Sequence, residues 1–188
     1  MGSSAARSTG GKRLTADNMR AGAFGPVRGY CSFLRNSVMG FALSAVLAGG
    51  VFAQCRDDRV ELRGDWGQAG FTVEIADDSG ERAQGLMYRD AMSSGAGMLF
   101  IYPRPQAAIA FWMRNTRIPL DIIYMDAQGV VQSIAHDAVP FDETPLPGGA
   151  GIQYVLEING GLARRLGIAP GTQLRHPAIT TPAWSCDE

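Results

Sequence analysis

Hydrophobic side chains after residue 53 recur mainly at every second position, which is the spacing of β-strands. Residues 71–75 alternate strictly between apolar and polar, as is typical of a strand with one solvated face. Other apolar runs of strand length end at residues that favour turns. The proline- and glycine-rich residues 140–151 are expected to form a loop. We therefore predict further strands over residues 98–102, 111–113, 120–125, 130–135, 154–158 and 173–175.

Two short segments carry helix signals instead. Asp78 and Glu81 have the spacing of a capping box, which predicts a helix from there to about Met87. Asn159 suits the N-cap of a second helix over residues 160–166, which Gly167 would end. Because strands and helices do not alternate regularly, we predict a mainly β fold, a compact antiparallel sandwich or barrel with one or two short helices.

An uncharged apolar run over residues 37–51 precedes this pattern. It is shorter than the roughly 20 apolar residues that cross a bilayer, so it is typical of a secretory signal and not of a membrane anchor. We expect cleavage near Ala53 and a periplasmic or secreted product with no stable membrane span. Met19 is an alternative start, and a lipoprotein with Cys55 as acceptor is an alternative that the preceding residues match poorly.

The predicted cleavage site divides the chain into parts with opposite charge. Residues 1–53 hold six Lys+Arg and one Asp+Glu, a net of +5, and the remaining residues hold 11 and 17, a net of −6. This acidic balance argues against a nucleic-acid surface, which requires basic side chains. The parts are a leader (1–53), an N-terminal extension (54–70), a β domain (71–175) and a C-terminal tail (176–188) that we expect to be loosely held.

Two of the three cysteines remain after cleavage. Cys31 lies in the leader, whereas Cys55 and Cys186 stand near the two ends of the mature chain. In an oxidising compartment these two can form one disulfide between the termini, which is our prediction. The alternative is a pair of free thiols.

Several motifs together resemble a known family. Residues 81–89, 97–100, 111–116 with 118–121, and 155–157 are similar, in the same order, to motifs of the domain-of-unknown-function family 192 of bacteria and archaea. The similarity covers about residues 71–174. It implies a compact, mostly β domain that often follows a signal peptide, and it implies no activity, because the activity of that family is not established.

The same period of two places polar groups on otherwise apolar faces. Asp121 shares a face with Ile123 and Met125, where a carboxylate is costly unless it is paired, and Glu157 shares a face with Val155. One interpretation is a pocket for a polar ligand. The other is structural, with Asp121 paired to an arginine, Glu157 capping a turn and Trp112 in the core. The predicted ligand-binding residues are Arg82, Arg89, Trp112, Asn115, Asp121, Glu157 and Asn159.

These residues favour an exported binding or accessory protein over an enzyme. The expected partner is a small polar molecule such as a sugar, or an envelope protein, and no cofactor is expected. The first alternative is a hydrolase of a polar envelope substrate with Asp121 and Glu157 as acid and base. The second is copper(I) binding through thioethers, for which core filler is the other interpretation. The candidate ligands are Met87, Met98 and Met113.

Zinc is not predicted. His136 and His176 are isolated in the sequence, with no second nitrogen or thiolate at the spacing of a zinc site.

Overall fold

The structure is a computed structural model that describes residues 55–188. The mainly β fold predicted from the sequence is confirmed. The predicted signal segment lies outside the described residues. The elements are β1 (Arg59–Gly64), β2 (Gly67–Ala76), α1 (Ser79–Gln84), β3 (Ala96–Gln106), β4 (Ile109–Phe111), β5 (Leu120–Met125), β6 (Val131–Ala138), β7 (Leu146–Gly149), β8 (Ile152–Asn159), α2 (Leu162–Leu166) and β9 (Gln173–Arg175).

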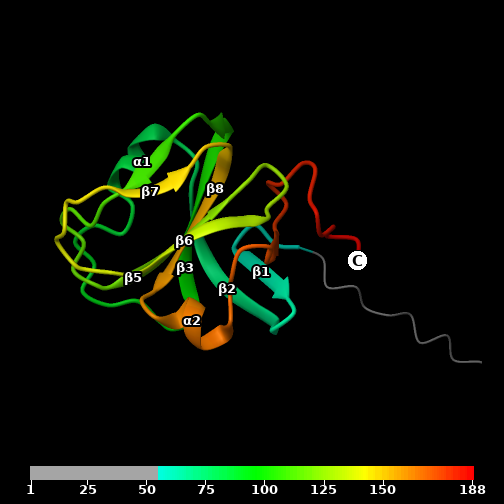
Figure 1. Cartoon of the computed structure of the whole chain (residues 1–188), viewed down its shortest axis with the longest axis horizontal. Helices are drawn as coiled ribbons and strands as arrows, with labels where there is room; N and C mark the ends of the chain where they lie inside the picture. The colour runs from blue at the N-terminus through cyan, green and yellow to red at the C-terminus, as the bar shows by residue number, and fades with distance from the viewer. Residues whose placement is uncertain (1–54) are drawn as a thin grey trace, which may run out of the picture. The chain divides into compact units, whose positions relative to one another are not determined.

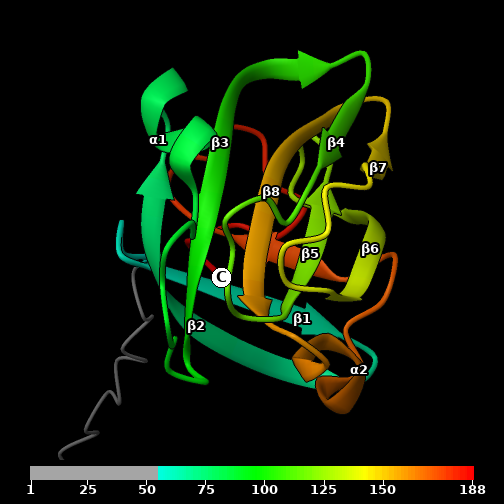
Figure 2. The same cartoon turned by 90° about the vertical axis from the view of Figure 1, so that its left-hand side faces the viewer.

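Seven of these strands form one curled sheet, in the order β6-β5-β8-β3-β2-β1-β9, and β4 pairs with β7 in a small second sheet (Figures 1 and 2). All strand pairs named within residues 55–188 are antiparallel except β2 with β3. The two edges of the large sheet meet at one corner. There Val130 and Gln173 form an isolated bridge, and Leu174 N donates to Gly129 O at 2.8 Å.

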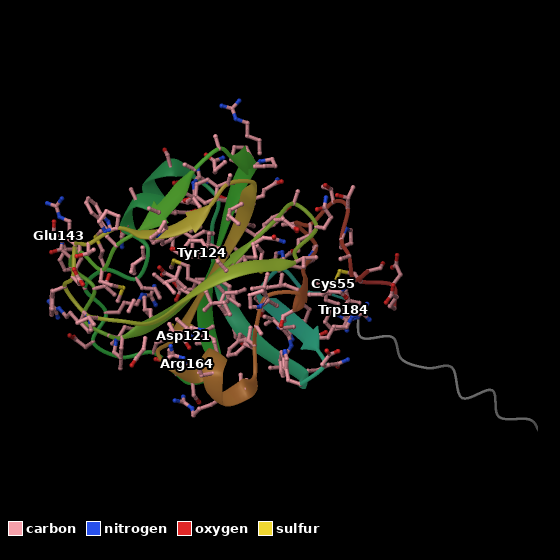
Figure 3. The ribbon with its side chains drawn as sticks, viewed as in Figure 1. Cys55, Asp121, Tyr124, Glu143, Arg164 and Trp184 are labelled. Atoms are coloured by element: carbon pink, nitrogen blue, oxygen red, sulfur yellow. A yellow bond between two sulfur atoms is a disulfide. The ribbon has the colours of Figure 1, made fainter. Side chains whose placement is uncertain are left out.

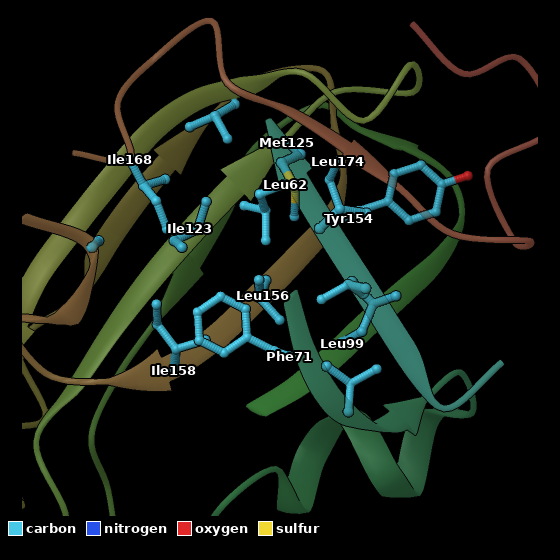
Figure 4. Packing of buried hydrophobic residues seen from close by; sticks show 14 of the residues in the cluster. Leu62, Phe71, Leu99, Ile123, Met125, Tyr154, Leu156, Ile158, Ile168 and Leu174 are labelled. Carbon is cyan, nitrogen blue, oxygen red and sulfur yellow. The ribbon is translucent and has the colours of Figure 1, made fainter. Parts of the chain in front are cut away.

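The core consists of two clusters on the two faces of this sheet. Figure 4 shows the first cluster, with Leu62, Phe71 and Leu156 from three different strands. All six residues of β5 are buried, because Ile123 and Met125 point into the first cluster. Leu120, Ile122 and Tyr124 point into the second. Both sides of β5 are covered by a core cluster, and its residues are therefore apolar except for Asp121.

The first helix begins as predicted and ends early. Asp78 accepts a hydrogen bond from Glu81 N at 2.8 Å in a complete capping box. The helix ends at Gly85 and does not continue to Met87, because Gly85 has φ of 50° and turns the chain away.

The second helix ends at Gly167 as predicted, but its N-cap is Gly161, which makes no side-chain cap. Asn159 is therefore not the cap. Its side-chain amide donates instead to the carbonyl oxygens of Met92 and Ser93.

Three segments differ from the sequence prediction. The strand predicted over residues 111–113 is β4, which ends at Phe111. The predicted loop 140–151 contains β7, because its residues pair with β4. Residues 59–70, expected as an extension, form β1 and the first part of β2.

The C-terminal tail is held against the sheet, which differs from the loose tail expected. Trp184 is 3% exposed, and its ring centroid lies 4.1 Å from the guanidinium carbon of Arg175 and 4.7 Å from that of Arg63. Tyr154 donates its hydroxyl to Ala178 O at 3.0 Å.

The predicted disulfide is present in the structure. It joins Cys55 to Cys186, whose Cα atoms lie 5.4 Å apart, and in Figure 3 Cys55 lies close to Trp184 of the tail. No helix within residues 55–188 combines the length and apolar character needed to cross a bilayer.

Candidate functional site

A pocket of about 210 Å³ opens beside α1 on the face of the sheet that carries the second core cluster. We call it the Glu157 pocket, after the carboxyl group in its wall. Its walls come from α1 and the turn after it, from β3, β4 and β8, and from the segment after β4. The lining residues are Arg82, Ala83, Gln84, Gly85, Leu86, Met87, Phe100, Tyr102, Ala110, Phe111, Trp112, Thr116 and Glu157.

Glu157 lies in the middle of β8, opposite Met98 of β3 and Ile122 of β5. The residue is 4% exposed. Burial raises the pKa of its carboxyl group to about 8, and no hydrogen bond from residues 55–188 lowers that pKa. A carboxyl group that is removed from water and receives no protein donor favours its neutral form.

Aromatic rings form much of the remaining wall. Phe111 meets Phe100 edge to face, with ring centroids 5.0 Å apart, and meets Tyr124 in the same way at 5.9 Å. Trp112 is 47% exposed, and its ring centroid lies 5.6 Å from the guanidinium carbon of Arg114. Trp112 is therefore not a core residue, and its exposed ring can serve as a platform for a ligand.

Arg82 brings a positive charge to the same pocket from the end of α1. Its Nη1 donates to Ile101 O at 2.9 Å and also to Asp77 O. Its guanidinium carbon lies 5.0 Å from the ring centroid of Tyr102. None of the ion pairs in the described part of the chain includes Arg82. The capping box of α1 fixes the segment from which this cation projects.

Gly85 leaves room for the pocket at the end of α1. A Cβ atom at this position would lie 3.2 Å from Cζ of Phe100. The φ of 50° also favours glycine. Both facts explain why the turn after α1 begins with a residue that has no side chain.

Three residues with unusual backbone angles hold the rim. Tyr88, Asn115 and Phe141 have φ of 65°, 54° and 63°. Tyr88 N donates to Asn115 O at 2.9 Å, and Phe141 N donates to Thr116 O at 3.2 Å. Conformations of this kind are costly for large side chains and persist where the surrounding structure enforces them, often at functional sites. They fix the segment that follows Trp112.

Of the predicted ligand-binding residues, the structure brings together Arg82, Trp112 and Glu157 in the pocket. Arg89 lies outside the lining and forms a bidentate pair with Glu74, with both N–O distances 2.5 Å. Asn115 supports the rim and donates to the hydroxyl of Tyr88 at 2.9 Å.

Asp121 is not part of the pocket, which corrects the prediction. It lies on the opposite face of the sheet from Glu157 and is completely buried. Its carboxylate accepts hydrogen bonds from Asp137 N at 2.7 Å, Gly161 N at 3.0 Å and Ala163 N at 2.6 Å. Figure 3 shows Asp121, a residue of β5, close to α2. Its carboxylate caps backbone N–H groups at the start of this helix. Asp121 therefore has a structural role, with backbone N–H groups in place of the expected arginine.

His136 lies near this buried carboxylate. Its Nδ1 is 3.9 Å from Oδ1 of Asp121 and has no hydrogen-bond partner among residues 55–188. Residues 55–188 contain no group of three His, Cys, Asp or Glu side chains that could hold a metal ion.

The candidate copper ligands lie in two environments. Met98 and Met113 are buried in the second core cluster, whereas Met87 lines the pocket. Copper binding stays untested.

Pocket residues that the sequence interpretation missed include Phe100 and Tyr102. The available signal was the period of two in β3, which places both on the face of Met98, and Met98 lies opposite Glu157. The contribution of the turn after α1 had no comparable signal, because it depends on how the helix docks.

The family model DUF192, described as "Uncharacterized ACR", matches residues 60–176. The search of curated proteins gave no match.

Two solved structures are similar to the chain. One is a protein of unknown function from Novosphingobium aromaticivorans DSM 12444, with 48% identity and a TM-score of 0.61, covering 62% of this chain and 83% of that one. The other is from Sinorhizobium meliloti 1021 and is described as a proposed transcription regulator. It has 36% identity and a TM-score of 0.63, covering 67% of this chain and 98% of that one.

Proposed function

The chain belongs to the DUF192 family, and we propose that it is an exported binding protein that holds a small polar ligand in the Glu157 pocket. The observation that carries this proposal is a buried carboxyl group that lines an open pocket and receives no hydrogen bond from the described residues. Glu157 is 4% exposed, so little water can hydrogen-bond to its carboxyl group, and a ligand that enters the pocket and supplies a donor gains affinity there.

The size and walls of the pocket restrict the ligand. At about 210 Å³ the pocket is smaller than the roughly 300–1,000 Å³ of sites for drug-sized molecules. It suits a single ring or a short chain. The half-exposed ring of Trp112 offers a flat apolar surface, as sugar rings and other amphipathic ligands require. A monosaccharide unit and a small amphipathic metabolite are both compatible with these walls.

Export is part of the proposal. The apolar run over residues 37–51 supports it, and so does the Cys55–Cys186 disulfide, because disulfides persist mainly in oxidising compartments. The walls of the pocket come from this one chain, which supports a small molecule over an envelope protein as the partner.

Two other functions receive less support. A hydrolase with paired carboxylates needs both groups at one bond, but Asp121 and Glu157 lie on opposite faces of the sheet. The regulator description of the Sinorhizobium structure raises nucleic-acid binding. Residues 54–188 carry 11 arginines, no lysine and 17 acidic residues, a net of −6, which disfavours a phosphate-binding surface.

A thermal-shift screen of the full chain tests the proposal. The compounds are monosaccharides, amino acids, polyamines and nucleotides. We expect at least one class to raise the melting temperature of the parent protein and of a Glu74→Gln control, whose exposed carboxylate lies outside the pocket. The same compound should have no effect on Glu157→Gln. An equal shift in Glu157→Gln, or no shift with any class, would contradict the proposal.

A further inference from the structure

We propose that the Glu157 pocket selects a small zwitterion, a free α-amino acid or a close analogue, with its ammonium group at Glu157 and its carboxylate at Arg82. This inference rests on the proposed binding function and adds the chemical class of the ligand. It follows from three features of the pocket. The carboxyl group of Glu157 receives no hydrogen bond from residues 55–188, the guanidinium group of Arg82 has no carboxylate partner among them, and aromatic rings form part of the wall.

The first feature favours a cationic donor over a neutral one. A hydroxyl group and an ammonium group can each satisfy the buried carboxyl group of Glu157, but the hydrogen bond between two charged groups is about twice as strong. The free-energy cost of removing a carboxylate from water is also partly offset when a cation binds beside it. The cation that would do this has to come from the ligand, because no ion pair among residues 55–188 includes Glu157.

The second feature requires an anion on the same ligand. Arg82 lines the pocket, is only partly exposed, and has no carboxylate within 4.0 Å in the described part of the chain. Its Nη1 donates to the carbonyl oxygens of Asp77 and Ile101, and these bonds leave the N–H groups of Nη2 and Nε for a ligand. A simple amine would be repelled by this guanidinium group, whereas a carboxylate can be recognised through the planar fork of its remaining N–H groups.

The third feature is the position of the rings. Tyr102 lies 5.0 Å from the guanidinium carbon of Arg82, and its pKa is raised by burial, lowered by Arg82 and raised by Glu157. Tyr102 therefore lies within electrostatic reach of both groups. Ring faces attract cations. Leu86 and Phe100 complete an apolar wall, which fits an uncharged side chain on the ligand.

Ammonium binding also predicts a pH dependence. Titratable groups that face Glu157 are Arg82 from α1, Tyr102 from β3 and Tyr124 from β5. Burial raises the pKa of both tyrosine hydroxyls above their ordinary value and raises the pKa of the Glu157 carboxyl group to about 8, so among these three acids it is Glu157 whose charge changes between pH 5 and pH 8. An ammonium ligand needs the ionised form, so its affinity should rise with pH across this range and binding should release a proton.

Isothermal titration calorimetry of the full chain tests the inference. The probes are neutral L-α-amino acids from glycine to phenylalanine, the amide of the best of them, which lacks the carboxylate, and the matching carboxylic acid, which lacks the amine. We expect the amino acid to bind at least tenfold more tightly than either truncated analogue. Its affinity should increase about tenfold or more from pH 5.5 to pH 7.5.

Variants assign each end of the ligand. Glu157→Gln and Arg82→Gln should each weaken amino-acid binding at least tenfold, and Arg82→Gln should not weaken binding of the amide. Arg104→Gln is the matched control, since Arg104 is exposed and lies outside the lining. If a neutral sugar binds in a Glu157-dependent way while the amino acids do not, the zwitterion inference is overturned and the proposed binding function stands. Amino-acid binding that Arg82→Gln leaves unchanged would also overturn it.

Discussion

At the scale of single residues, the burial of Glu157 couples folding to pH. The pKa of its carboxyl group is about 8 in the folded protein, against 4.5 as the ordinary value. Between these pH values the folded state keeps a proton that the unfolded state has lost, so the free energy of unfolding falls as pH rises. We expect the parent protein to lose roughly 3 kcal/mol between pH 5 and pH 8 from this group, at about 1.4 kcal/mol per pKa unit.

Urea unfolding at several pH values, with the disulfide intact, measures this effect. The Glu157→Gln protein has no titrating proton at the site, so its free energy of unfolding should depend less on pH than that of the parent. Parallel pH profiles for the two proteins would show that Glu157 is not buried as described.

Asp121 is a buried carboxyl group that stabilises the fold, because backbone N–H groups donate hydrogen bonds to it. Asp121→Ala leaves three backbone N–H groups without their acceptor, and at about 1–3 kcal/mol for each unsatisfied buried group the loss should be about 3 kcal/mol or more. Asp121→Asn keeps one acceptor oxygen and should lose less. Ligand affinity of the folded fraction should not change. A variant with parent stability and reduced affinity would contradict the structural role.

The two acids also show what sequence could predict at this scale. The period of two assigned Asp121 and Glu157 correctly to faces of their strands. It could not identify their partners. Asp121 binds backbone groups at Gly161 and Ala163, about 40 residues further along the chain, and backbone donors leave no signal in residue type.

At the scale of elements, α1 depends on its cap because the helix has no buried residue. Asp78→Ala removes the acceptor for Glu81 N, and we expect the free energy of unfolding to fall by about 1 kcal/mol. Amide hydrogen exchange should accelerate within α1, and amino-acid affinity should fall because Arg82 is less well positioned. Ser79→Ala is the control inside the same helix. Equal exchange rates in both variants would show that the cap does not hold α1.

The bounds of a helix or strand were predictable where residues within that element determine its structure. The capping box of Asp78 and Glu81 located the start of α1, and the apolar run of β5 gave its bounds. The strand β7 was not predictable in the same way. It contains Pro147, Gly148 and Gly149, which locally favour a loop, and it becomes a strand because β4 supplies its hydrogen-bond partners.

At the scale of the whole molecule, the disulfide ties together two ends that are 131 residues apart in sequence. Closing so long a loop restricts the unfolded chain, so reduction should lower the free energy of unfolding by about 2–4 kcal/mol. A Cys55→Ser/Cys186→Ser protein should match the reduced parent in urea unfolding. An unchanged unfolding midpoint after reduction would contradict a stabilising bridge.

The arrangement of the whole sheet was only partly predictable. A mainly β domain followed from strand spacing and short helices, but the bridge between Val130 and Gln173 joins segments with no matching local signal. The pocket is a property of the same scale, because Arg82, Trp112 and Glu157 come from separate elements. The sequence was enough to choose these residues as candidates. Their proximity could not be predicted, because it depends on how α1 packs against the sheet.

Carbon-13 NMR of the glutamate side-chain carboxyl groups at pH 7 tests the central claim most directly. Without ligand, the Glu157 signal should have the shift of a neutral carboxylic acid. On saturation with the amino acid that binds best, it should move to the shift of a carboxylate, while the Glu74 signal stays constant. A Glu157 signal that is already ionised without ligand, or that does not respond at saturation, would contradict the account.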